Sequence, residues 1–111
     1  MEIRTYVHLF HILFVGSLFL YVGIQRTAIS STMDPILFGL GLFVIVYHSY
    51  KVYNYMKLGK GYWVNLIHIL LVGPLLVYIG YNREKTARLY FELLIMLAFA
   101  AIGYHGYYLF E

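Results

Sequence analysis

The chain of 111 residues is 62% apolar and only 12% charged, with a net charge of +3. An average soluble domain is roughly 45–50% apolar and about 25% charged, and a domain this small buries only about 60% of its surface. The composition therefore excludes an ordinary water-soluble domain and predicts a single all-α domain in a lipid bilayer. The sequence has no cysteine, which excludes disulfides and thiolate metal sites. Because the positive charge is small and scattered, we expect no nucleic-acid partner.

Four stretches without a charged residue predict the helices in chain order. Each is close to the roughly 20 residues that a helix needs to cross a bilayer, and none has the alternation of a barrel strand. The second stretch is short, but Lys51 can extend its side chain toward the headgroups, and Val52 and Tyr53 can then lengthen the span. The stretches run from 5 to 25, from 35 to 50, from 61 to 82 and from 93 to 110. The sequence therefore predicts four transmembrane helices.

The ends of these stretches have features typical of helix termini and membrane interfaces. Asp34 is expected to cap the second helix, with Pro35 in its first turn, and Pro74 is expected to kink the third helix. Tyrosines and the single tryptophan crowd the ends of the spans, as in an interfacial belt. Orientation is not predicted, because four Lys or Arg side chains fall on each side of the membrane. These are Arg4, Lys51, Lys57 and Lys60 on the side of the termini, and Arg26, Arg83, Lys85 and Arg88 on the other.

An internal repeat relates the two halves of the chain at an offset of 57 residues. Positions 11–26 and 68–83 align without a gap and share nine of 16 residues, and Tyr47-His48 aligns with Tyr104-His105. The pattern predicts a tandem duplication of a two-helix unit, with repeats at 1–55 and 56–111 in one structural domain. Because each unit has two spans, both units enter the membrane from the same side. Together they predict an up-down-up-down bundle with a pseudo-twofold axis along the membrane normal.

Helix packing is predicted from small residues. Gly16 and Gly23 are seven residues apart and share a helix face, and Gly73 and Gly80 repeat this spacing. Lipid gives no hydrophobic drive for helix association, so small residues that permit close backbone approach favour packing. Further glycines in the second and fourth spans are expected to act in the same way. A stripe of every seventh residue, Arg4, His11, Leu18 and Gln25, is expected to face the interior.

Four histidines occupy matching places in the two repeats. His11 and His68 lie near the start of the odd helices, and His48 and His105 lie near the end of the even ones. Since the helices alternate in direction, all four are expected on the side of the termini, in one layer or as two offset pairs. Neutral imidazole is a ligand for zinc, copper, iron or haem iron. The alternative is a hydrogen-bonded layer that ties the helices together through tyrosine hydroxyls. The candidate partners are Tyr47, Tyr50, Tyr104 and Tyr107.

The chemistry-bearing residues leave three functions open. The spans contain no Asp or Glu, and the chain has no nucleophile constellation, phosphate loop or selectivity filter. The favoured expectation is a non-enzymatic structural subunit without a cofactor, in contact with the bilayer and with other membrane subunits or copies of itself. It would suit an accessory subunit of a membrane complex or a virion membrane protein. The alternatives are an electron-transfer protein with haem b or a transition metal on the histidines, and a conduit for protons or another small species.

Overall fold

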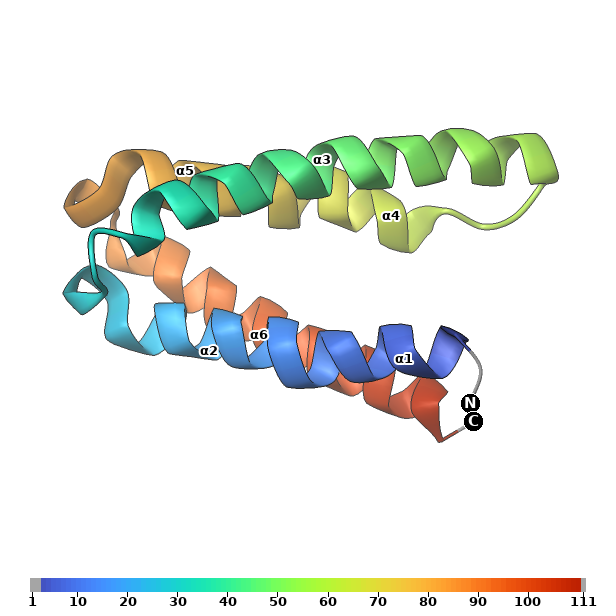
Figure 1. The fold of residues 1–111 in the computed structure, drawn as a ribbon, viewed down its shortest axis with the longest axis horizontal. Helices are drawn as coiled ribbons and strands as arrows, with labels where there is room; N and C mark the ends of the chain where they lie inside the picture. The colour runs from blue at the N-terminus through green and yellow to red at the C-terminus, as the bar shows by residue number, and fades with distance from the viewer. Residues whose placement is uncertain (1–2, 111) are drawn as a thin grey trace. The chain divides into compact units, whose positions relative to one another are not determined.

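The computed structural model describes residues 3–110, and all regular structure in this range is helical (Figure 1). Two of the short segments are π-helical, η1 and η3, and two are 3-10 helices, η2 and η4. The elements are α1 (Ile3–Phe10), η1 (His11–Val15), α2 (Gly16–Gln25), η2 (Arg26–Ala28), α3 (Met33–Leu58), α4 (Trp63–Ile67), η3 (His68–Val72), α5 (Gly73–Asn82), η4 (Arg83–Lys85) and α6 (Arg88–Leu109).

Four continuous helical stretches within residues 3–110 are long and apolar enough to cross a membrane, as predicted. They are Ile3–Ala28, Met33–Leu58, Trp63–Asn82 and Arg88–Leu109. The largest difference from the prediction is in the second, where α3 continues through the lysines to Leu58. Asp34 does not cap this helix, because α3 begins at Met33 and Asp34 lies buried in its first turn. A carboxylate there still interacts favourably with the positive end of the helix dipole.

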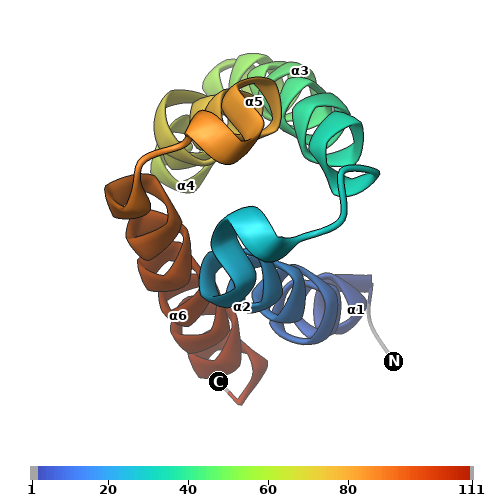
Figure 2. The same ribbon diagram turned by 90° about the vertical axis from the view of Figure 1, so that its left-hand side faces the viewer.

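The helices form two compact units, each a pair of neighbouring spans (Figures 1 and 2). Unit 1 combines α1, η1 and α2 with α6, and unit 2 combines α3 with α4, η3 and α5. Each unit therefore joins the odd span of one sequence repeat to the even span of the other. Within unit 2 the two spans are antiparallel, since Gly80 lies near Asp34 and Gly73 lies near Gly41.

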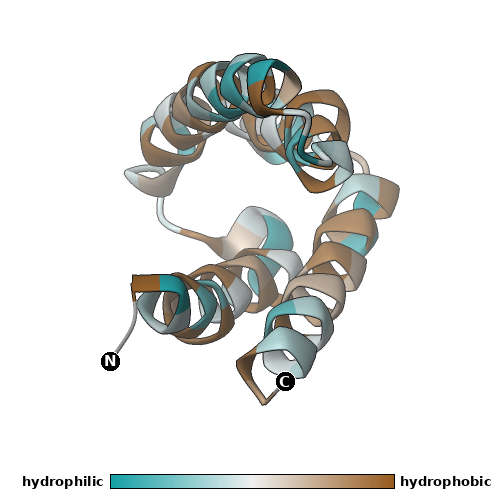
Figure 3. Ribbon diagram, turned by 90° about the vertical axis from the view of Figure 1, so that its right-hand side faces the viewer, coloured by the Kyte–Doolittle hydropathy of each residue, from teal (hydrophilic) through white to brown (hydrophobic). Residues whose placement is uncertain are grey.

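Each unit has a thin seam of buried apolar side chains between its two spans. Phe91 and Leu94 of α6 are fully buried in unit 1 with Val22, and Leu37 of α3 is fully buried in unit 2 with Leu76. Most of the remaining apolar surface faces outward. At most 39% of the most apolar window of any span is buried. Apolar residues occur around the helices in Figure 3, so these surfaces require an apolar environment.

Close contact with the opposite span occurs at the four glycines that the spacing singles out, and at Gly23, Gly73 and Gly80 it includes backbone atoms of that span. A Cβ atom added to Gly16 would lie 2.7 Å from a side-chain carbon of Ile102, and one added to Gly80 would lie 2.6 Å from the carbonyl oxygen of Asp34. Gly23 faces Ile95 in unit 1, and Gly73 faces Ile45 in unit 2. Subtracting 57 from Ile102 gives Ile45, so the two units have matching contacts.

The glycines of the second and fourth spans are not equivalent to one another. A Cβ atom on Gly41 would lie 2.7 Å from the carbonyl oxygen of Gly73. Gly39, Gly103 and Gly106 have no neighbour within 4 Å of that position among the described residues. The predicted packing role therefore fits Gly41, whereas these three glycines have no such contact with the described residues of their own units.

A π-helical turn interrupts the first span at η1 and the third span at η3. The backbone N–H of Gly16 donates to the carbonyl of His11, and the N–H of Gly73 donates to the carbonyl of His68. A π turn contains one additional residue and shifts the register of everything that follows. The predicted inward stripe is wrong at both ends, because Arg4 is exposed before the turn and the register changes after it. Gln25 is exposed, and the buried face of α2 contains Gly16, Phe19, Val22 and Gly23.

The π turn in the third span does not depend on Pro74. The first span has the same turn, although Ser17 stands at the corresponding position. The shared features are the histidine that begins the turn and the glycine that follows it. The expected difference between a kinked third span and a regular first span is therefore wrong.

Gly80→Ala and Gly39→Ala are a matched test of the glycine contacts. Gly80→Ala should lower the free energy of unfolding by about 1–3 kcal/mol, because the new methyl group meets backbone atoms that cannot move independently. Gly39→Ala should leave stability unchanged or raise it by up to about 1 kcal/mol, because alanine favours the helix and the site is open. Denaturant titration of the purified protein in detergent measures both. Equal stability of the two variants would contradict the packing role of Gly80.

Candidate functional site

The four predicted histidines form two stacked pairs, one in each unit. The rings of His11 and His105 have centroids 4.2 Å apart at an interplanar angle of 21° in unit 1. The rings of His48 and His68 have centroids 4.0 Å apart at 18° in unit 2. Each pair joins the odd span of its unit to the even span. The sequence left open one layer or two offset pairs, and the structure has one stacked pair in each unit.

A backbone hydrogen bond orients one ring of each pair. Nδ1 of His11 donates to the carbonyl oxygen of Val7 at 2.8 Å, and Nδ1 of His68 donates to the carbonyl oxygen of Val64 at 2.8 Å. A carbonyl oxygen can only accept, so the Nδ1 atoms carry the protons and the neutral rings have their lone pairs on Nε2. Each acceptor is four residues before its histidine.

The second ring of each pair has a polar partner that differs between the units. Nδ1 of His48 donates to Oδ1 of Asn65 at 2.7 Å. At the matching position of unit 1, Nδ1 of His105 lies 2.8 Å from Nδ1 of His8. One of these two nitrogens must donate and the other accept, so the bond shares a single proton between two imidazoles. Only unit 1 has this arrangement among the described histidines, because Asn65 replaces His8 in unit 2.

The predicted tyrosine partners have unequal places. Tyr47 and Tyr104 lie edge-on to the histidines that follow them in sequence, with centroid distances of 5.2 Å and 5.1 Å. Tyr50 and Tyr107 are 64% and 68% exposed. Tyr47 and Tyr104 therefore contact the candidate site through their rings, and hydrogen bonds from tyrosine hydroxyls to the histidines stay a prediction.

The geometry limits the ways in which these histidines could hold a metal or haem. A hydrogen bond from Nδ1–H to a carbonyl oxygen is the usual second contact of a histidine that ligates a metal through Nε2. However, axial haem ligation requires the iron between two rings whose nitrogens face each other, and face-to-face stacking does not provide this. Among residues 3–110, no group of three or more His, Asp or Glu side chains is placed to hold a metal ion. His8 lies beside the pair of unit 1, but its Nδ1 is engaged in the hydrogen bond to His105. One pair therefore supplies at most two imidazole ligands.

Sequence reasoning missed several parts of this site. The offset of 57 aligns His8 with Asn65, which signals equivalent positions but not their hydrogen bonds to His105 and His48. The carbonyl acceptors of Val7 and Val64 have no side-chain signal. The π turns likewise have no signal in the sequence other than the histidine that begins each turn and the glycine that follows it. The chain matches no family model, no curated protein and no solved structure.

Substitutions of His48 should distinguish which ring nitrogen stabilises unit 2. His48→Ala should lower the free energy of unfolding by about 0.6–2 kcal/mol, since Asn65 loses its partner. His48→Asn should recover part of this loss, because its amide nitrogen lies near the place of Nδ1. His48→Gln places its amide near Nε2 and should recover less. Denaturant titration in detergent measures the order, and better recovery by Gln than by Asn would contradict the bond from Nδ1 to Asn65.

Proposed function

We propose that the chain is an integral membrane protein whose four spans form an up-down-up-down bundle. We further propose that it is a non-enzymatic structural subunit, which packs laterally against other subunits or copies of itself. The matching contacts of the two units support a tandem duplication with repeats at 1–55 and 56–111. The observation that favours lateral packing is the outward apolar surface, which is larger than the buried seam of either unit.

An apolar groove on unit 2 supports this proposal most directly. The groove has a volume of about 560 Å³ and lies along α3 and α5. Ridges of side chains on one helix pack into grooves of this kind on another. The lining residues are Phe38, Leu42, Ile45, Pro74, Val77, Tyr78, Tyr81 and Asn82. A transmembrane helix of a neighbouring subunit would fill the groove, whereas lipid chains alone would cover it without specific contacts.

The histidine pairs have a structural role in this proposal. Each pair joins two spans through a stacked contact, and each ring is fixed by a hydrogen bond within its unit. Polar contacts between membrane helices stabilise by about 0.6 kcal/mol on average. Their larger effect is on register, because a slip of one residue would separate the rings.

Photocrosslinking tests the proposal in native membranes. A benzophenone amino acid at Leu42, which lines the groove, should give protein adducts, because a neighbouring helix occupies that position. The same probe at Phe43, which is 63% exposed on α3 and does not line the groove, should give mainly lipid adducts. Mass spectrometry of the adducts distinguishes a second 13.0 kDa chain from another subunit. Lipid adducts alone at both positions would contradict lateral assembly through this groove.

A second candidate function is electron transfer with a metal or haem on the histidines. It is favoured by the hydrogen bonds of His11 and His68 to backbone carbonyls, which place the lone pairs on Nε2. Proton passage has weaker support, because unit 2 lacks the hydrogen bond between two imidazoles that unit 1 has.

An absorption spectrum and metal analysis of the detergent-purified protein should separate the structural role from the redox role. We expect a colourless protein without stoichiometric metal, because each stacked pair is already fixed by its own hydrogen bonds. Haem or a transition metal at one equivalent or more, lost in His68→Ala but retained in Tyr50→Phe, would contradict the structural role of the pair.

A further inference from the structure

The C-terminal part of α3 is basic and has no nearby acidic residue in the sequence. The helix continues from the end of its apolar stretch to Leu58, and Lys51, Lys57 and Lys60 fall within ten residues. No Asp or Glu occurs between positions 35 and 83. Asp34, the nearest acidic residue that precedes these lysines, is at the opposite end of α3. The positive charge at this end of unit 2 therefore has no acidic partner within that stretch of the chain.

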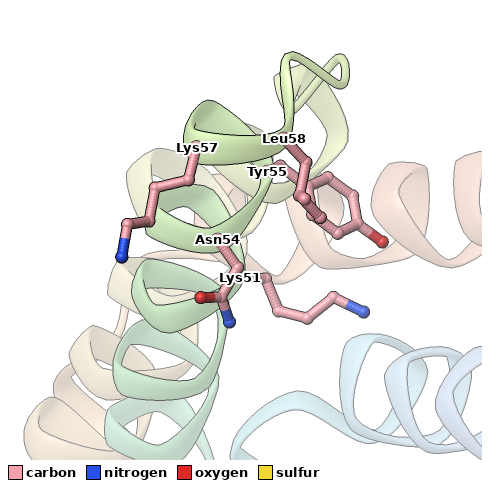
Figure 4. Close-up of a pocket in the computed structure, with 5 residues that line it drawn as sticks. All are labelled: Lys51, Asn54, Tyr55, Lys57 and Leu58. Atoms are coloured by element: carbon pink, nitrogen blue, oxygen red, sulfur yellow. The ribbon is translucent and has the colours of Figure 1, made fainter.

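A groove on this part of α3 brings basic, polar and aromatic side chains together (Figure 4). Its volume is about 590 Å³, within the range of small-molecule sites. Four of its residues have i, i+3, i+4 and i+7 spacing, which places them on one helix face. The lining residues are Lys51, Asn54, Tyr55, Lys57 and Leu58. The groove therefore combines ammonium groups and an amide with an aromatic and an aliphatic surface.

Two ammonium groups converge on one tyrosine ring. Nζ of Lys51 lies 5.3 Å and Nζ of Lys60 lies 5.7 Å from the ring centroid of Tyr55. Nζ of Lys57 lies 4.7 Å from the ring centroid of another tyrosine, Tyr53, and points away from Lys51 in Figure 4. Cation–π contacts favour each ammonium separately, but like charges that approach one ring repel each other. A bound anion would offset this repulsion and accept hydrogen bonds from the ammonium groups.

The depth of the groove in the bilayer indicates which kind of anion would bind there. A helix with the 26 residues of α3 is about 39 Å long, which exceeds a bilayer core of about 30 Å. Its lysine-rich end therefore extends to the level of the headgroups. Tyr53 and Trp63 are 59% and 58% exposed at the same end of unit 2, as is typical of residues at the membrane interface. An anionic phospholipid would place its phosphate among the lysines and its acyl chains along the apolar part of α3.

We propose that Lys51, Lys57 and Lys60, with Tyr55, form a binding site for the phosphate group of an anionic phospholipid. Lys51 and Lys60 donate to the phosphate oxygens beside Tyr55, Lys57 adds positive charge to the same end of α3, and Leu58 contacts the apolar part of the lipid. The proposal rests neither on a function of the histidine pairs nor on lateral assembly. If the lysines only stabilised the negative C-terminal end of the α3 helix dipole, the protein would show no preference for one phospholipid over another.

Fluorescence quenching by brominated lipids tests the site, because Trp63 is the only tryptophan and follows Lys60 by three residues. The full chain is reconstituted into mixtures of phosphatidylglycerol and phosphatidylcholine, and either lipid is brominated in turn. Brominated phosphatidylglycerol should quench Trp63 more strongly at equal mole fraction. Each Lys→Gln substitution at positions 51, 57 and 60 should weaken the preference about fivefold, and the triple variant by on the order of 100-fold.

Lys85→Gln is the matched control, since it removes the same charge from an exposed lysine of η4 in the same unit. It should leave the lipid preference unchanged. The preference of the unmodified chain should fall as salt rises from about 0.05 to 0.5 M, which provides a test even if the triple variant does not fold. Equal quenching by both lipids, or the same loss in Lys85→Gln, would overturn the proposal. Loss of the preference with inorganic phosphate at constant ionic strength would instead assign the site to a soluble anion and overturn the lipid assignment.

Discussion

Close approach of two helix backbones at glycine is the constraint on which both units depend. In lipid, apolar side chains gain nothing from leaving the solvent, so van der Waals packing at short distance must hold the spans together. Gly80 allows the backbone of α5 to reach Asp34 and Phe38, and Gly23 allows α2 to reach Phe91. A side chain larger than hydrogen at either position meets neighbouring backbone atoms. The buried seam is thin, and these contacts therefore set the separation and register of each pair of spans.

The histidine pairs follow from the same contacts. Gly16 and Gly73 approach the opposite span and donate their backbone N–H groups to His11 and His68, which closes the π turns. The turns rotate each histidine relative to the glycine face and place its ring against the histidine of the other span. The packing contacts of the glycines and the polar contacts of the histidines therefore depend on the same π turn in each unit. The difference between His8 and Asn65 changes its hydrogen bonding in one unit without changing the stacked geometry.

The sequence predicted the spans and the four glycines at contacts, because charge-free length and heptad spacing are local properties. It also aligned His11 with His68 and His48 with His105. Which spans pair could not be predicted, since short links permit several arrangements of four helices. The π turns were missed because their cause is a backbone bond from Gly16 or Gly73 rather than a residue type. Gly39 and Gly103, like Gly41, are small residues within a span, so the sequence predicted the same role for all three. Only the register of the contacting helices determines that Gly41 has a close neighbour and that Gly39 and Gly103 have none among the described residues. The extension of α3 beyond Tyr53 to Leu58 was missed because the charged and polar residues that follow were taken as the end of the span.

The pairing of the first span with the fourth, and of the second with the third, is tested most directly by disulfide formation in this cysteine-free chain. The suitable pairs are Gly16→Cys with Ile102→Cys and Gly73→Cys with Ile45→Cys. A Cβ atom at Gly16 lies 2.7 Å from Cγ1 of Ile102, and one at Gly73 meets Cγ1 of Ile45, so a cysteine sulfur in the place of Cγ1 is near enough to form a disulfide. Both should crosslink within one chain in membranes under mild oxidation. Gly73→Cys with Phe43→Cys, an exposed position on α3, should not. Failure of both expected pairs, or equal crosslinking of the control, would contradict the two-unit fold.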